Sequence, residues 1–359
     1  MLIHPDVETA IRLCLRHNRP FVAYSAPGSS TLHFHSSGTT VECPGNRHFI
    51  ISAFNSPVSE MLHIPLTHNA AETISLLADT IPSLPTYPSP LPPKPTTHSS
   101  YTAGLARVIS HLRTHGGKCV ISRAICGQYT DEADWIGFAK EYFNTYPDTH
   151  RYFYHTPQTG TWIVASPELL LRYDSTSMRL STVSLAGTRI AGSKQPWDEK
   201  NIKEHNIVTD FITSTLRNAG IEPHTAPETS TMHFGHIEHL YDPIEAEAVL
   251  DKHQLMGLLA DLSPTPALAG YPRKDALKLI EDTEGHKRLC YGGFIGFSEP
   301  DGSVETVVNL RCIHFWAGSY CIYAGGGIMP DSDPEQEWEE TQHKSRTARY
   351  LAEKMIKHP

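Results

Sequence analysis

Hydrophobic residues recur at intervals of three and four over several long segments, and short apolar runs bounded by glycine or proline separate these segments. The first pattern predicts amphipathic helices and the second predicts buried strands. Helices are expected near 6–17, 101–114, 198–218, 246–262, 275–284 and 333–355, and strands near 21–25, 31–36, 118–123, 152–154, 161–165, 184–189, 291–297, 304–315 and 320–323. Because the strands do not alternate singly with helices, the order indicates an α+β fold rather than a doubly wound sheet.

A proline-rich stretch divides the chain. Seven prolines lie between positions 82 and 95, and proline cannot continue a helix or a central strand. We therefore predict an N-terminal α+β lobe at 1–81, packed on the core, a connector at 82–100 and a larger core at 101–359. With 359 residues, of which 39% are hydrophobic, the chain is long enough for a sizeable core.

Composition excludes several classes of protein. No apolar run reaches the length of a membrane span, and the first residues lack the layout of a secretory signal, so a cytoplasmic protein is expected. Seven cysteines without a C-x-x-C motif indicate neither a disulfide framework nor a zinc ribbon. A formal charge of -9 argues against nucleic-acid binding. We expect a monomer that acts on a small molecule, with no membrane or nucleic-acid partner.

The C-terminal helix carries charged residues on its apolar face. Asp333 is a good N-cap and Pro334 suits the first helical position. The apolar stripe continues towards the N-terminus through Glu337, Glu340 and Lys344. Acidic residues in a first turn are also favoured by the helix dipole, with a lysine four residues later as partner, and this explanation suffices for Glu335 and Glu339. For the inward-facing charges we favour a binding site, because a buried charge needs a partner or a ligand.

Other polar residues interrupt buried segments. Lys118 opens an apolar strand, where a lysine is usually an edge residue whose ammonium reaches water. Pro167 should kink its strand and aim Glu168 into a cavity, and Glu204 lies on the apolar face of the helix at 198–218. The three glycines after Tyr323 would let an anion approach backbone N–H groups.

A histidine cluster offers a different kind of site. His233, His236 and His239 invite a zinc interpretation. Gly235 would break a helix that carried them, and the chain has 22 histidines. The zinc site is therefore the less favoured interpretation.

Several short motifs occur together in one order from about Tyr101 to the C-terminus: K-C-V-I-S-R, A-S-P-E-L-L-L, S-L-A-G-T-R, K-E-H-N-I-V, P-T-P-A-L-A-G-Y-P, Y-G-G-F-I-G, N-L-R-C, Y-A-G-G-G-I-M-P and E-W-E-E-T-Q-H-K. With these motifs the chain resembles the chorismate-utilising enzymes, and among them the isochorismate synthases of menaquinone or siderophore pathways. The resemblance implies two large antiparallel sheets packed together and wrapped by helices. Val164 and Ser263 depart from the family pattern at positions that adjoin the implied site.

The resemblance also implies roles for individual residues. Glu204 and Glu340 would bind Mg²⁺ and Glu337 would support the ion through water, in keeping with the preference of magnesium for oxygen ligands and retained waters. The ion would hold the ring carboxylate of chorismate. The substrate would further contact Gly187, His239, Arg311, Gly325, Gly326 and Lys344.

The implied reaction is a Mg²⁺-dependent isomerisation of chorismate to isochorismate. Lys118 would deprotonate a water that attacks C2, and Glu168 would protonate the hydroxyl that leaves C4. Both roles require shifted pKa values, which burial and neighbouring charge can produce. Two alternatives stay open at this point: a salicylate synthase that also eliminates pyruvate, and a non-catalytic protein that binds carboxylates through Mg²⁺.

Overall fold

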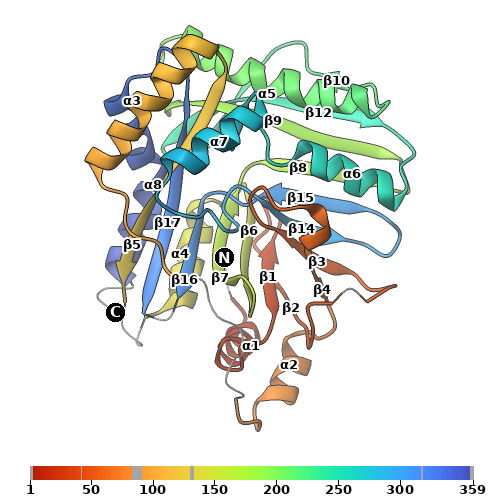
Figure 1. The fold of residues 1–359 in the computed structure, drawn as a ribbon. Coiled ribbons are helices and arrows are strands. Elements are labelled where there is room, and N and C mark those ends of the chain that lie inside the picture. The colour runs from red at the N-terminus through yellow and green to blue at the C-terminus, as the bar shows by residue number, and fades with distance from the viewer. Residues whose placement is uncertain (1–2, 42, 83–90, 130–132, 317, 356–359) are drawn as a thin grey trace.

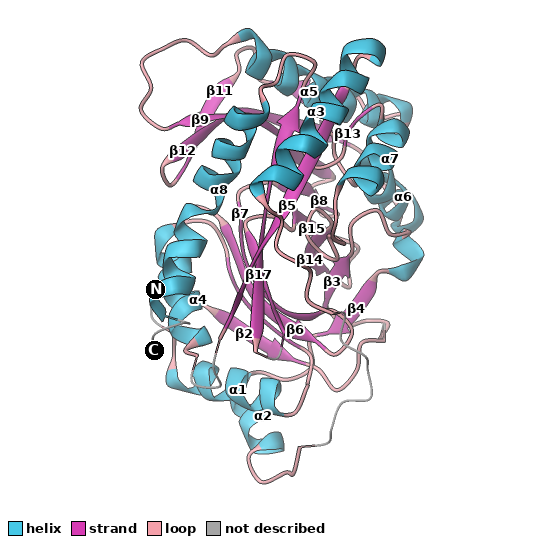
Figure 2. Ribbon diagram, turned by 60° about the vertical axis from the view of Figure 1, so that its left-hand side comes forward, coloured by secondary structure: helices cyan, strands magenta, loops and turns pink. Residues whose placement is uncertain are grey.

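Two antiparallel β-sheets form the centre of the fold, and helices cover their outer faces and ends (Figures 1 and 2). The computed structural model describes residues 3–41, 43–82, 91–129, 133–316 and 318–355. The α+β class and the pair of large antiparallel sheets predicted from the sequence are confirmed. Within the described ranges, no helix combines the length and the apolar character needed to cross a membrane.

Sheet A has eight strands. In spatial order they are β13 (Gly270–Tyr271), β5 (Lys118–Gln128), β17 (Ser319–Ile328), β16 (Cys312–Trp316), β7 (Gly160–Ser166), β6 (His150–Thr156), β1 (Phe21–Ser25) and β2 (His33–Ser36). The longest pairing joins β5 to β17 from Cys119 to Gln128. Both strands reach the candidate site along this pairing.

Sheet B contains β10 (His224–Thr225), β12 (Ile237–Glu247), β9 (Arg179–Ile190), β8 (Leu169–Asp174), β15 (Val304–Val308), β14 (Phe294–Ser298), β3 (His48–Ser52) and β4 (Leu62–Pro65), with β11 (Ser230–Phe234) paired to β12. The N-terminal lobe contributes to both sheets, since β1 pairs with β6 and β3 pairs with β14. The proposed domain boundaries stay predictions.

The helices are α1 (Pro5–Arg16), α2 (Ala70–Leu77), α3 (His98–His115), α4 (Trp135–Thr145), α5 (Glu199–Asn218), α6 (Lys252–Leu262), α7 (Arg273–Thr283) and α8 (Pro334–Met355), with a 3-10 turn, η1, at Val58–Glu60. The helices α1 and α2 pack together at one end of the molecule, away from α3, α5 and α7 at the other end (Figures 1 and 2). Helix α5 packs on β9, and α8 packs on β17.

The alternation of side chains along each strand explains where the core lies. In β1, Val22 belongs to the cluster between the two sheets, whereas Phe21 and Ala23 face the outer cluster under α1, α4 and α8. In β6, Phe153 faces that same outer cluster, and its neighbours on either side face the inner one. Successive side chains of a strand point to opposite faces, so each strand of sheet A serves two apolar layers.

Several elements differ from the sequence-based expectation. The strand expected at 304–315 is two strands, because the chain leaves β15 at Val308 and turns through Arg311, whose φ is +50°. The helix expected from 246 begins at Lys252, where Asp251 caps it, and Ala246 is still part of β12. Here the apolar residues at the end of a strand have the same spacing as those expected in the first turn of a helix.

The strand expected at 320–323 is longer, because the three glycines after Tyr323 lie inside β17. Gly325 pairs with Ser122 of β5, and Gly326 pairs with Ile121. The pairing of β17 with β16 ends at Ile322. The glycine-rich half of β17 therefore has a strand on one edge, and the pairing with β16 does not cover its other edge.

The proline-rich connector is only partly described, because residues 83–90 lie outside the described ranges. Its second part follows β5, where Thr96 N donates a hydrogen bond to Ala124 O at 2.9 Å. Helix α3 begins at His98, inside the expected connector at 82–100. Thr97 caps this helix through its side chain, which explains the early start.

Candidate active site

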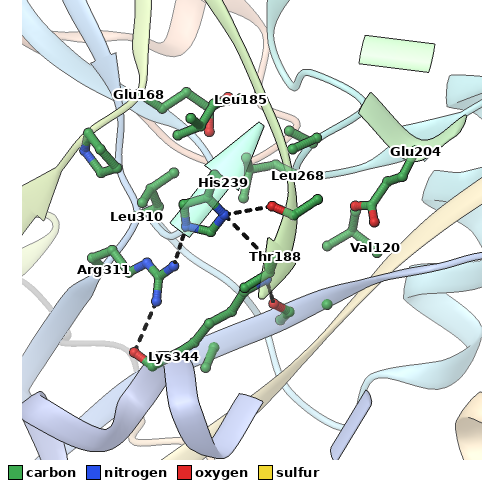
Figure 3. A pocket seen from close by; sticks show the side chains of 18 of the residues that line it. Val120, Glu168, Leu185, Thr188, Glu204, His239, Leu268, Leu310, Arg311 and Lys344 are labelled. Atoms are coloured by element: carbon green, nitrogen blue, oxygen red, sulfur yellow. Dashed lines mark hydrogen bonds between the residues drawn. The ribbon is translucent and has the colours of Figure 1, made fainter. Parts of the chain in front are cut away.

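A cavity lies where β9 and β12 of sheet B meet β17 of sheet A, with α5 and α8 beside it (Figure 3). Its empty volume is about 670 Å³, which includes its opening to solvent. Eight of the eleven residues given a catalytic, substrate-binding or metal-binding role line it: Glu168, Gly187, Glu204, His239, Arg311, Gly325, Gly326 and Lys344. Lys118, Glu337 and Glu340 are not among its lining residues. The cavity is lined by polar side chains and by hydrophobic ones such as Leu268, as are most small-molecule sites.

Lys118 is buried rather than placed at an exposed edge. Its Nζ atom lies 3.0 Å from Glu204 Oε1, and its side chain is 0% exposed. Burial disfavours the charged form of Glu204, but Lys118, Lys200 and Lys344 outweigh this effect and lower the pKa of Glu204 below its usual value. The explanation of Lys118 as an edge residue that reaches water is therefore wrong.

Two further ion pairs involve lysines and glutamates of α5 and α8. Lys200 Nζ is 2.5 Å from Glu337 Oε1, and Lys344 Nζ is 2.6 Å from Glu340 Oε1. Ser332 Oγ also donates to Glu337 Oε1 at 2.6 Å. Burial, and next the charge of Glu340, raise the pKa of Glu337 to about 7.

The three carboxylates converge on two glycines of β17, and we call Glu204, Glu337 and Glu340 the carboxylate cluster. A Cβ atom on Gly327 would lie 2.0 Å from Glu204 Oε1, and one on Gly326 would lie 2.8 Å from Glu337 Oε2 and 3.4 Å from Glu340 Oε1. The missing side chains therefore make room for the carboxylate oxygens above the strand.

The carboxylate cluster offers the donors that a hard divalent cation prefers. Among the residues that the structure describes, Glu337 Oε2 is buried without a hydrogen-bond partner, and all ligand atoms that the cluster offers are oxygens. In the described part of the chain, no three His, Cys, Asp or Glu residues are already arranged around a common metal position. The residues fit a metal such as Mg²⁺ by their chemistry, while lysines hold the carboxylates in the arrangement seen here.

Glu168 lies where the chain crosses from one sheet to the other. Strand β7 of sheet A ends at Ser166, and β8 of sheet B begins at Leu169, so Pro167 marks the predicted kink. Thr265 Oγ1 donates to Glu168 Oε1 at 3.3 Å. Burial raises the pKa of Glu168 to about 8, although Thr265 and nearby cations oppose the shift. Glu168 can therefore hold a proton near neutral pH.

Arg311, His239 and Gly187 form a hydrogen-bonded chain along one wall (Figure 3). Arginine only donates, so His239 Nε2 accepts from Arg311 Nη2 at 3.1 Å and His239 Nδ1 donates to Gly187 O at 2.8 Å. Burial, with the charges of Arg311 and Lys344, holds the pKa of His239 well below its usual value. The imidazole is thus neutral, and its tautomer is fixed by its partners.

Lysine and arginine side chains complete this wall. Arg311 Nη1 donates to Lys344 O at 3.1 Å, and Lys344 Nζ donates to Gly325 O at 2.9 Å. Guanidinium N–H groups that are not used in these bonds remain available to an anion. The cavity therefore places two fixed cations next to the half of β17 that the pairing with β16 leaves uncovered.

The histidines of the zinc interpretation have different partners. His236 Nε2 contacts His343 O at 2.8 Å, and His233 Nδ1 lies 3.3 Å from Glu238 Oε2. The third member, His239, faces the cavity. The arrangement does not support a zinc site.

Sequence reasoning missed Lys200 and the aromatic wall. Lys200 lies four residues before Glu204 on α5, so the same helical periodicity that identified Glu204 also places Lys200 on the inward face. Tyr291 and Tyr323 line the cavity and stack with ring centroids 5.3 Å apart. Tyrosines at the ends of apolar strands carry no signal that separates a cavity wall from a core.

Comparison with known proteins gives a consistent result. Residues 58–349 match the family described as chorismate binding enzyme. Isochorismate synthase EntC of Escherichia coli (strain K12) is 35% identical over 208 residues, which are 55% of this chain and 52% of the relative. Anthranilate synthase component 1 of Thermus thermophilus is 31% identical over 201 residues, 51% of this chain and 42% of the relative. The chain thus spans about half the length of the curated relatives it matches.

Two solved structures share the fold. One is described as the 2,3-dihydroxybenzoate-specific isochorismate synthase DhbC from Bacillus anthracis, with a TM-score of 0.75, 21% identity, and coverage of 96% of this chain and 99% of that chain. The other is MenF, the menaquinone-specific isochorismate synthase from Escherichia coli, with a TM-score of 0.74, 19% identity, and coverage of 94% and 90%.

Proposed function

Because the chain belongs to the chorismate-binding enzyme family, we propose that it is a Mg²⁺-dependent isochorismate synthase that converts chorismate to isochorismate. The observation that carries this proposal is the pair of Lys118 and Glu168. Lys118 is buried and paired with Glu204, which lines the cavity, and Glu168 is a carboxyl group that lines the same cavity and whose pKa is raised to about 8. Such a pair can act as base and acid in one reaction.

The proposed reaction exchanges one hydroxyl group for another. Lys118 acts as the base and takes a proton from a water molecule, and the water oxygen forms a bond to C2 of the ring. The ring double bonds shift, the C4–O bond breaks, and Glu168 gives its proton to the departing hydroxyl, which leaves as water. One water molecule enters and one leaves, so the product is an isomer of the substrate.

The wall that contains Arg311 and Lys344 supports binding of a carboxylate. Chorismate carries two carboxylates, and the one on its enolpyruvyl group would meet Arg311, Lys344 and backbone N–H groups near Gly325 and Gly326. Both side chains line the cavity. The neutral His239 holds the guanidinium in place through its Nε2 atom. Gly187, whose carbonyl binds His239, would lie against the substrate.

The carboxylate cluster supports the Mg²⁺ requirement. Glu204 and Glu340 would bind the ion directly, and Glu337 would bind it through water. Bound there, Mg²⁺ would supply positive charge to the ring carboxylate. Without a cation, the three glutamates are already paired with three lysines, and the cluster offers no net positive charge to a dianionic substrate.

Product analysis tests the proposal directly. Chorismate incubated with the protein and Mg²⁺ should give a mixture with isochorismate on chromatography, and EDTA should abolish the conversion. In ¹⁸O-water the C2 hydroxyl of isochorismate should carry the label. An unlabelled C2 oxygen would contradict the mechanism, and full activity in metal-free buffer would contradict the metal requirement.

The same experiment separates the alternatives. Stoichiometric pyruvate in a coupled lactate dehydrogenase assay would identify a salicylate synthase. Unchanged chorismate, together with calorimetry that shows Mg²⁺-dependent binding, would identify a non-catalytic binding protein. Isochorismate as the final product would suit a role in menaquinone or siderophore synthesis.

A further inference from the structure

Each member of the carboxylate cluster is paired with a lysine of its own. The pairs come from three elements, β5, α5 and α8, and are Lys118 with Glu204, Lys200 with Glu337, and Lys344 with Glu340. Three ammonium groups and three carboxylates sum to a formal charge of zero. The metal-free cluster is therefore already neutralised by the protein itself.

Lys200 differs from the other two lysines. The proposed reaction uses Lys118 as base and Lys344 as a substrate contact, but it gives Lys200 no role. Lys200 also lies in the first turn of α5, where the helix dipole disfavours a cation. Its position is therefore explained by the carboxylates it faces rather than by the helix that carries it.

Lys200 also has a path to solvent that Lys118 lacks. The Lys200 side chain is 24% exposed, whereas that of Lys118 is 0% exposed. A lysine ammonium on a long flexible stem can rotate into water when another cation takes its place. Glu337 Oε1 accepts from Lys200 and Ser332, while Oε2 lies without a hydrogen-bond partner near Gly326. A metal held near Oε2 would meet the ammonium as a like charge.

We propose that Lys200 is a resident counter-ion of the carboxylate cluster, a side chain that competes with the divalent cation and makes metal binding depend on the anionic substrate. This inference rests on the proposed function. A dication added to a neutral cluster leaves an excess of two positive charges, which a dianionic substrate then balances. Without Lys200 the cluster carries one negative charge, and the metal can bind on its own.

Metal binding without catalysis tests this inference. Wild type and Lys200→Met are treated with EDTA, dialysed, and titrated with Mg²⁺ by calorimetry in the absence of chorismate, with Mn²⁺ and electron paramagnetic resonance as a second readout. Lys200→Met should bind the metal about tenfold more tightly than wild type, since one adjacent positive charge has been removed from a partly buried site. Adding chorismate should strengthen metal binding strongly in wild type and much less in the variant.

Lys203→Met is the matched control. Lys203 lies on the same helix and pairs with Glu199, at 3.5 Å, with a side chain that is 63% exposed. Its replacement should leave metal affinity unchanged, and Lys200→Arg, which keeps the positive charge, should resemble wild type. Lys200→Gln replaces Lys200→Met if the latter does not fold.

Unchanged or weaker metal binding in Lys200→Met and Lys200→Gln would overturn the inference and would mean that Lys200 only orients Glu337. If wild type binds metal with chorismate present but the variants show no higher metal affinity than wild type, only this inference fails. If wild type binds no metal even with chorismate present, the proposed Mg²⁺ requirement fails as well.

Discussion

Lys118 Nζ lies 3.0 Å from Glu204 Oε1, and this ion pair joins the first residue of β5 in sheet A to α5, which packs on sheet B. Both side chains are almost completely withdrawn from water. Removing one partner of a buried pair leaves an uncompensated charge, whereas removing both does not. The pair therefore links the proposed base to the integrity of the fold.

Unfolding in urea should reveal this link. Lys118→Met should lower the free energy of unfolding by about 3–5 kcal/mol, because Glu204 loses its buried partner. Glu204→Gln on the Lys118→Met background should recover a large part of that loss. If the losses of the two single variants simply add in the double variant, the two residues do not interact as the structure shows.

Glu168 should make stability fall as pH rises. Burial raises its pKa from the model-compound value of 4.5 to about 8. Between these values the folded protein keeps a proton that the unfolded chain has released, so the free energy of unfolding decreases with pH, by up to about 1.4 kcal/mol per unit. Glu168→Gln should lack this part of the pH dependence. Its free energy of unfolding should therefore increase relative to that of wild type between about pH 5 and pH 8. Identical slopes in urea unfolding would contradict the raised pKa.

The turnover of chorismate should depend on the protonated form of the same residue. The rate should fall as pH rises through about 8, because the proposed acid then loses its proton. Glu168→Gln should reduce kcat by roughly 10²–10⁴-fold, the usual contribution of a general acid. The variant should also lose the high-pH limb of the profile. If Glu168→Gln still showed the decrease in rate at high pH, that decrease would arise from another group.

Gly327→Ala should disrupt the carboxylate cluster. The new Cβ would lie 2.0 Å from Glu204 Oε1 and 3.0 Å from Lys118 Cε, so the ion pair must move. Metal binding, measured by calorimetry, should be lost together with turnover. Gly257→Ala on α6 is the control, because nothing lies within 4 Å of its added Cβ and alanine suits a helix. Retained metal binding in Gly327→Ala would show that Glu204 is not part of the site.

Arg311→Lys should weaken substrate binding more than it slows chemistry. A lysine cannot keep the bonds to His239 Nε2 and Lys344 O and also present a planar pair of donors to a carboxylate. We expect KM for chorismate to rise about tenfold or more, with a smaller change in kcat. Arg12→Lys on the exposed face of α1 is the control. A fall in kcat at unchanged KM would assign Arg311 a different role.

Much of the candidate site could be predicted from the local periodicity of hydrophobic residues. The inward face of α8 follows from the spacing of Trp338, Leu351 and Ala352, and the buried positions of Glu337 and Thr341 agree with it. Asp333 caps α8 as expected, since its Oδ1 accepts from the N–H groups of Glu335 and Gln336. A helix reports its buried face through residues that are close in sequence, so no distant contact is needed.

Long-range pairing could not be predicted in the same way. Nothing in residues 48–52 indicates that β3 pairs with β14, more than 200 positions later. The burial of Lys118 likewise depends on Glu204 and on the pairing of β13 with β5. Such features arise from contacts between segments that are distant in the sequence. The local pattern of a single sequence does not indicate which distant segments come into contact.

The position of the cavity between the sheets also has a thermodynamic consequence. Its walls come from β9 and β12 on one side and from β17 and α8 on the other, so no single sheet contains the site. A ligand that binds only this assembled cavity stabilises the native state in proportion to the logarithm of its concentration over Kd. The proposed substrate and metal would therefore stabilise the packing of one sheet on the other, and saturating ligand should slow hydrogen exchange even in strands that never touch it.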